Sequence, residues 1–62
     1  MSLATGTKVL IRGRYEDFTD HLDGEEGTVL DGMVDVNGFI TIADAEGYKW
    51  YVQATDVTTI ES

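Results

Sequence analysis

The sequence predicts a small all-β domain, and two features of residues 27–52 carry that prediction. Residues of the β-branched and aromatic types, which are enriched in strands, dominate this stretch. Two turn signals divide it, namely the Asn37-Gly38 pair and the segment 44–47 that ends in Gly47. The stretch is therefore predicted to form three consecutive strands, a β-meander.

One further strand is predicted on each side of the meander. Residues 7–12 alternate, with Val9 and Ile11 on one face and Lys8, Leu10 and Arg12 on the other. Leu10 disturbs this division, so it either covers a second small apolar surface or faces a partner. Residues 57–60 are predicted to form a short closing strand after a 3₁₀ turn within 53–56. Residues 1–6 and 61–62 are expected to fray.

The strand that begins at Gly27 needs an irregularity. Val29 and Val34 can share a face only if one extra residue lies between them, and Gly32 is the expected site of a bulge. The turn that follows has two possible forms. A two-residue turn would set Asp35 opposite Ile40, whereas a loop of about four or five residues would avoid that pairing.

The connection 13–26 holds six of the twelve acidic residues. Tyr15, Phe18 and Leu22 have the spacing of one helical stripe, and Gly24 stands where a helix would end. Because eight residues make a marginal helix, an irregular loop with at most a helical turn is expected. Either Phe18 or Leu22 is expected to close one end of the domain.

The chain of 62 residues is predicted to be one domain, 1–62, with an ordered part at about 7–60. A domain of this size buries only about 60% of its unfolded surface, so marginal stability is expected. Phe39 is also expected to be inside. The predicted core consists of the inward-facing apolar residues Val9, Ile11, Val29, Val34, Ile40, Ile42, Trp50, Val52 and Val57.

The charge balance limits the classes of partner. Twelve acidic residues against four basic ones give a net charge of −8. Binding to nucleic acids and to anionic membranes relies on Lys and Arg, so direct nucleic-acid binding and membrane binding are disfavoured. A protein partner that is basic or carries an apolar patch is expected, unless the charge serves only solubility.

Cellular location is inferred from what the sequence lacks. Cysteine is absent, no apolar run reaches the roughly 18 residues of a membrane span, and the first seven residues lack the layout of a signal peptide. A cytoplasmic location is therefore expected, and the oligomeric state is left open.

Four short motifs give the chain a resemblance to the SH3-like small barrels, over roughly residues 7–60. They are Val9 with Ile11, Gly27-Thr28-Val29, Trp50-Tyr51-Val52 and Asp56-Val57. The chain looks most like the KOW-type and photosystem-accessory-subunit branch, and Arg12-Gly13, Asp23-Gly24 and Gly27-Thr28-Val29 are also similar to barrels of some ubiquitin ligases. The resemblance implies five strands, a long acidic loop after the first and a 3₁₀ turn before the last.

The chain departs from two branches of this family. It lacks the Ala-Leu-Tyr-Asp and Pro-Ser-x-Tyr stretches with which signalling SH3 domains bind polyproline. KOW-type domains are usually basic, whereas this chain is acidic. Neither polyproline recognition nor direct RNA binding is therefore expected.

Catalysis and metal binding find little support. Serine occurs only at Ser2 and Ser62, and His21 is the single histidine, so a nucleophile with its base cannot be assembled. Asp17, Asp20 and Asp23 recur every third residue, which is not the spacing of an EF-hand loop. The chain is expected to be no enzyme and to need no metal or cofactor.

The aromatic residues give the functional hypothesis, because they outnumber what a small barrel must bury. Aromatic side chains are enriched at protein interfaces, and acidic rims steer basic partners. A non-catalytic protein-interaction module is therefore predicted, which binds through loop 14–23 and exposed aromatics. The candidate partner-binding residues are Tyr15, Glu16, Asp17, Phe18, Asp20, Tyr48 and Tyr51.

Three alternatives remain open. Tyr15 and Phe18 could merely fasten the loop to the barrel. The protein could instead be an acidic nucleic-acid mimic of the phage or mobile-element type, whose carboxylates imitate phosphates and inhibit a DNA- or RNA-binding protein. Weak nucleic-acid binding by the barrel itself would require the basic residues to converge on one face, that is, Lys8, Arg12, Arg14 and Lys49.

Overall fold

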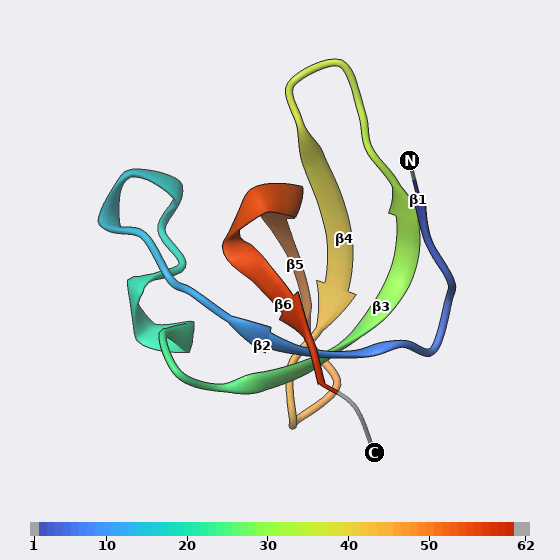
Figure 1. Ribbon diagram of the computed structural model, residues 1–62. Helices are drawn as coiled ribbons and strands as arrows, with labels where there is room; N and C mark the ends of the chain where they lie inside the picture. The colour runs from blue at the N-terminus through green and yellow to red at the C-terminus, as the bar shows by residue number, and fades with distance from the viewer. Residues whose placement is uncertain (1, 61–62) are drawn as a thin grey trace.

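The protein folds around a strongly bent antiparallel sheet, seen in a computed structural model that describes residues 2–60 (Figure 1). Six strands and three short 3₁₀ turns make up this part of the chain, which contains no α-helix. The prediction of an all-β fold is confirmed. In chain order the elements are β1 Ser2–Leu3, β2 Lys8–Ile11, η1 Tyr15–Asp17, η2 Asp20–Leu22, β3 Glu26–Met33, β4 Phe39–Ala43, β5 Lys49–Gln53, η3 Ala54–Asp56 and β6 Val57–Thr59.

Five of the strands follow the order β5-β4-β3-β2-β6. The long strand β3 is shared, because its first half pairs with β2 and its last residues pair with β1, while β4 runs along its other edge. The two ends of this order, β5 and β6, are joined by η3 but do not pair with each other within residues 2–60. The described sheet is therefore open between β5 and β6.

The N-terminal segment differs from the prediction, since Ser2–Leu3 forms β1 instead of fraying. Leu3 lies opposite Gly32 in the register. A Cβ atom at Gly32 would overlap with the backbone of Leu3, so the absence of a side chain there lets β1 approach β3. Residues 1, 61 and 62, whose fraying was also expected, lie outside the described residues.

The bulge in β3 was expected at Gly32, but the register with β4 shifts between Val29 and Asp31. Leu30 is therefore the extra residue. The strand ends at Met33, and Val34 lies beyond it with 40% of its surface exposed. The prediction that Val34 belongs to the core is wrong because the strand ends before it, at the start of a turn.

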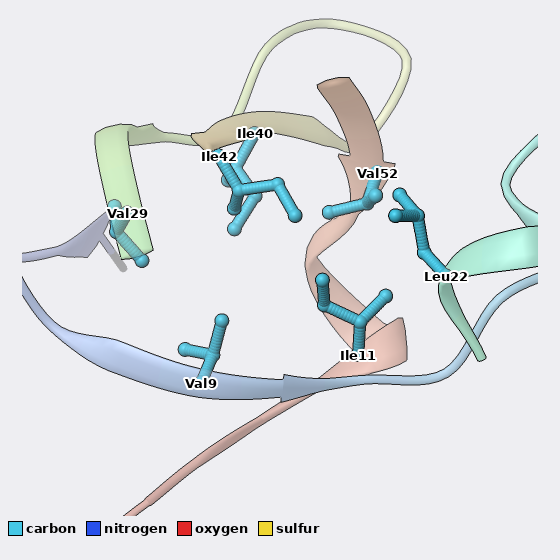
Figure 2. Packing of buried hydrophobic residues seen from close by; sticks show 7 residues of the cluster. All are labelled: Val9, Ile11, Leu22, Val29, Ile40, Ile42 and Val52. Carbon is cyan, nitrogen blue, oxygen red and sulfur yellow. The ribbon is translucent and has the colours of Figure 1, made fainter. Parts of the chain in front are cut away.

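The buried core lies inside the bend of the sheet (Figure 2). Leu22 belongs to it, as one of the two predicted alternatives, whereas Phe18 is exposed. The predicted core residues Trp50 and Val57 are only partly buried and pack against its margin, and Phe39 is partly exposed on the outer face of β4. The fully buried apolar residues are Val9, Ile11, Leu22, Val29, Ile40, Ile42 and Val52.

The same turn occurs at both ends of β4, over residues 35–39 and 44–48. In each, the N–H of the first residue donates to the carbonyl of the fifth, at 3.0 and 2.9 Å. The first residue is an aspartate whose Oδ1 accepts from the N–H groups of the third and fifth residues. Gly38 and Gly47 hold the fourth position with φ near +90°, which favours glycine. Of the two turns considered around Asn37-Gly38, the longer loop is the one observed.

Asp44 connects its turn to the core margin. Its Oδ2 accepts a hydrogen bond of 2.9 Å from Nε1 of Trp50. That bond, together with backbone N–H donors in the turn, holds the pKa of Asp44 below its ordinary value, and burial opposes this only partly. The carboxylate form is therefore the one that stabilises the fold.

We expect the melting temperature of Asp44→Asn to depend less on pH in the acid range than that of the wild type. A carboxylate whose pKa is lowered by folding stabilises the protein above its unfolded value of about 3.9, and this contribution is lost as pH falls toward the folded pKa. The melting temperature of the wild type should fall over that range by more than that of the variant. Glu46→Gln, which removes a charge from the same turn but none of these bonds, is the control and should keep the wild-type slope. An unchanged slope in Asp44→Asn would contradict this role.

Candidate functional site

The long connection between β2 and β3 consists of two 3₁₀ turns, η1 and η2, rather than a helix. Phe18 ends η1 in the left-handed conformation, with φ of 59°. This breaks the expected helical stripe, so that Leu22 turns into the core while Tyr15 and Phe18 turn outward. The turn is fixed by Thr19, which is almost fully buried and whose Oγ1 accepts from the N–H of Arg14 at 3.0 Å.

Arg14 ties the base of this loop to η3. Its Nε donates to Oδ2 of Asp56 at 2.6 Å, and the N–H of Arg12 donates to the Asp56 carbonyl at 2.7 Å. The Asp56 side chain is almost completely buried, and its Oδ1 accepts no hydrogen bond from any group within residues 2–60. The hydrogen bond and the charge of Asp56 raise the pKa of Arg14. The loop is thus held by a charge-assisted bond from a half-exposed side chain.

The tip of the loop presents two aromatic side chains to solvent, since Tyr15 and Phe18 are each 79% exposed. Glu16 and Asp20 are exposed beside them, and Asp17 is half-buried. A non-glycine residue in the left-handed conformation carries backbone strain of about 1–2 kcal/mol. An aromatic residue is therefore held outward at a position where its backbone is unfavourable.

Part of the predicted partner-binding set is brought together by Gln53. Its Nε2 lies 3.4 Å from Oδ2 of Asp17, which places η1 beside the end of β5. Tyr51, 66% exposed, points to the same outer face of β5 as Gln53, two residues earlier. The Asp17–Gln53 contact thus brings loop residues 15–20 to the strand that carries Tyr51, and this set is called here the loop–β5 surface: Tyr15, Glu16, Asp17, Phe18, Asp20, Tyr51 and Gln53.

Tyr48 is not brought to this surface. It lies in the turn before β5 instead of in the strand, five residues from Gln53 along the chain. At about 3.3 Å per residue, that places it about 16 Å from the Asp17 contact. Tyr48 is exposed like the other candidates, but it belongs to the opposite end of β5.

Three residues of the site region were not assigned to the partner-binding site from the sequence. Arg14 and Gln53 position the loop, and His21 packs its ring edge-on against Trp50, with ring centroids 4.6 Å apart. The Arg14–Asp56 and Asp17–Gln53 contacts join residues 42 and 36 positions apart. Proximity across such separations leaves no local pattern in the sequence.

Two of the four basic residues, Lys8 and Lys49, share a face of the sheet, and a third, Arg14, is paired with an acidic residue. Lys8 donates to Oγ1 of Thr28 at 2.8 Å and lies with Lys49 in one cross-strand row on the outer face, through Thr28 and Ala43. Arg14 is bound to Asp56 on another part of the molecule.

The described part of the chain offers little for other kinds of site. Residues 2–60 hold no group of three or more His, Asp or Glu side chains arranged to bind a metal ion. None of its helical turns is long and apolar enough to cross a membrane. An apolar hollow of about 190 Å³ lies between β1, β3, β4 and η3, beside Leu3 and Val34.

No protein-family model matches the chain, and neither a curated protein nor a solved structure matches it significantly.

Proposed function

We propose that the protein is a non-catalytic interaction module that binds a protein partner through the loop–β5 surface. The observation that carries the proposal is Phe18, an aromatic side chain held in solvent by a strained backbone on an anchored loop. Strain of this kind persists where the surroundings enforce it, and it clusters at binding sites. A residue that only fastened the loop to the domain would be expected to pack against it, and neither Tyr15 nor Phe18 does.

The partner in this proposal is basic or has an apolar patch. Glu16, Asp17 and Asp20 surround the two loop aromatics, and the chain carries a net charge of −8. Such a field accelerates the approach of a basic protein, while buried aromatics supply most of the binding energy. Tyr51 extends the aromatic surface from the loop to the sheet.

We also propose that the fold is an SH3-like barrel whose open side is closed by a side chain. The strand order and the 3₁₀ turn before β6 support this assignment. Leu22 of η2 lies near Val52 of β5 and Ile11 of β2 in the core, which fits a role in covering the core beside the open edge of β5 (Figure 2). A cooperative single unfolding transition would be expected of such a closed core.

A nucleic-acid mimic is the competing function. Its support is the number of exposed carboxylates in the loop, at Glu16, Asp20, Asp23, Glu25 and Glu26. The two functions differ in their response to salt. Binding carried by carboxylates that imitate phosphates should weaken steeply as salt rises, whereas binding anchored by aromatics should change little.

We predict that Phe18→Gly stabilises the protein and weakens its binding. Relief of the left-handed strain raises the free energy of unfolding by about 1–2 kcal/mol. The greater conformational freedom of glycine in the unfolded chain lowers it by about 0.4–1 kcal/mol. The net gain is about 0.5–1 kcal/mol, or roughly 2–8 °C in melting temperature for a domain of this size. Loss of an aromatic anchor should at the same time weaken partner binding about tenfold or more.

The measurement is affinity capture from a cell extract by the wild type and by variants, followed by titration of the purified partner at two salt concentrations. Val36→Ser is the matched control, because Val36 is a fully exposed apolar residue on a different loop. The control should leave partner affinity unchanged. If Phe18→Gly is more stable and binds the partner as tightly as the wild type, the loop is not the binding site.

A further inference from the structure

One edge of the sheet is left without a partner strand. β5, Lys49–Gln53, is the last strand of the sheet order and pairs along one side with β4 in an unbroken register from Phe39↔Gln53 to Ala43↔Lys49. Within residues 2–60 no other strand pairs with it, although η1 reaches its last residue through the Asp17–Gln53 contact and the ring of His21 packs against Trp50.

The flanking hydrogen bonds show which backbone groups face that free edge. The turn bond from the Asp44 N–H to the Tyr48 carbonyl and the bond from the Ala54 N–H to the Gly38 carbonyl both join β5 to the β4 side. In an antiparallel pair, hydrogen-bonded positions alternate with non-bonded ones. Trp50 and Val52 therefore turn their N–H and C=O groups toward β4, whereas Lys49, Tyr51 and Gln53 turn theirs away.

The outward N–H and C=O groups of Lys49, Tyr51 and Gln53 are regularly spaced, as in a strand that can pair with another strand. The strand has no bulge against β4, and the chain has no proline to block the edge. Natural proteins usually protect such edges with bulges, prolines, charges or covering segments. Here the strand's one charged side chain is Lys49, at its first position. A regular strand edge without a bulge or a proline is what an added strand requires.

We propose that an extended basic segment of the partner adds to the free edge of β5 as a further strand. This rests on the proposed function and specifies how the partner is held, because Tyr51 of the loop–β5 surface lies at the centre of the edge. Carboxylates stand at both ends of β5, with Asp17 beside Gln53 and Asp44 and Glu46 in the turn before Lys49. Basic side chains on the added strand would meet charges of opposite sign at either end.

A second copy of the chain is a poor occupant of the same edge. Antiparallel pairing of two β5 strands about Tyr51 would set Lys49 of each copy opposite Gln53 of the other, which pairs no opposite charges. It would also bring together two molecules that each carry −8. Like charges at this distance are only partly screened at physiological salt.

The first test uses hydrogen exchange with a synthetic peptide of seven residues that alternates lysine and valine. In the free protein, the amides of Lys49, Tyr51 and Gln53 should exchange fast, while those of Trp50 and Val52 should be protected. Added peptide should slow the three outward amides about tenfold or more. A peptide with glutamate in place of lysine should bind far more weakly. A version N-methylated on the alternate residues that pair with β5 should lose the protection.

The second test uses Tyr51→Pro beside Tyr51→Thr. Proline removes an N–H that faces away from β4, so the pairing of β5 with β4 is retained, as at natural edge strands. Tyr51→Pro should weaken peptide binding about tenfold more than Tyr51→Thr, which removes the aromatic ring alone. If the proline variant fails to fold, the N-methylated peptide makes the same comparison on the wild-type protein.

The outcomes separate this proposal from the proposed function. If the lysine peptide is bound but only amides of residues 14–23 are protected, the edge is not the site, while the loop remains one. If the peptide does not bind, or the glutamate peptide binds equally, the basic strand is the wrong occupant. If salt instead produces a dimer with the outward β5 amides protected, the occupant is a second copy. Equal loss of peptide affinity in Tyr51→Pro and Tyr51→Thr would mean that the aromatic ring of Tyr51, and not the backbone edge, carries the binding.

Discussion

Replacing Leu22 by alanine is expected to remove most of the stability of this protein. Leu22 is 4% exposed and belongs to the core cluster, where it lies near Ile11 and Val52 (Figure 2). Truncation of a buried leucine to alanine typically costs about 2–5 kcal/mol. The total for 62 residues is only roughly 3–9 kcal/mol. Urea denaturation followed by tryptophan fluorescence should therefore show a large fall in the midpoint.

Leu10→Ala is the matched control for this experiment. Leu10 is also a leucine, but it lies on the outer face of β2 and is 45% exposed. Its truncation should change the free energy of unfolding by less than about 1 kcal/mol. Equal effects of the two substitutions would mean that Leu22 does not fill the core and that the long loop is not anchored by it.

The second large effect is expected from Gly13→Ala at the start of the long loop. A Cβ atom at Gly13 would overlap with the carbonyl oxygen of Thr19 and lie 2.8 Å from the nitrogen of Asp23. Both are backbone atoms, and the Thr19 carbonyl accepts the N–H of Leu22 at 2.8 Å. The methyl group can be accommodated only by moving the loop, so the expected destabilisation reaches or exceeds the about 1–3 kcal/mol of core overpacking.

Gly32→Ala is an informative comparison, because its added methyl group would overlap with the backbone of Leu3. The segment displaced there is only the two-residue strand β1. Thermal unfolding should therefore show a smaller loss for Gly32→Ala than for Gly13→Ala. If Gly13→Ala melts like the wild type, the close packing of the loop base is not a feature of the protein in solution.

The elements that follow from local pattern were predictable from the sequence. Val9 and Ile11 alternate with exposed residues, so their shared inward face could be assigned from the period of two. The 3₁₀ turn before the last strand was recognisable from a segment too short and too polar for a helix. In each case the structure depends on neighbours within a few residues.

What the sequence left undecided depends on distant partners. The choice between Phe18 and Leu22 as the buried residue depends on the backbone at Phe18, which is fixed by bonds from Arg14 and Thr19. The strand at Ser2–Leu3 exists because Gly32, thirty residues away, leaves room for it. Val34 was predicted to be buried because its residue type suits a core strand, but β3 ends at Met33, just before it.

For the candidate site, the sequence supplied the residue types, while the fold decides which of them are neighbours. Tyr15, Phe18 and Tyr51 are exposed as the functional hypothesis requires. The grouping was not predictable, because Tyr48 and Tyr51 are close in the chain but Tyr48 lies in the turn before β5 and Tyr51 at the centre of the strand. The free edge of β5 could not be inferred from composition, since it depends on the order of the strands.

The repeated turns on either side of β4 also bear on how the chain folds. Each closes a hairpin between residues only four positions apart, through an aspartate and a glycine that favour the turn before any tertiary contact exists. The pairing of Val9 with Thr59, by contrast, must close a loop of fifty residues. Local closure has the lower entropic cost and is faster. We therefore expect β3, β4 and β5 to form the folding nucleus, with β2 and β6 joining after the rate-limiting step.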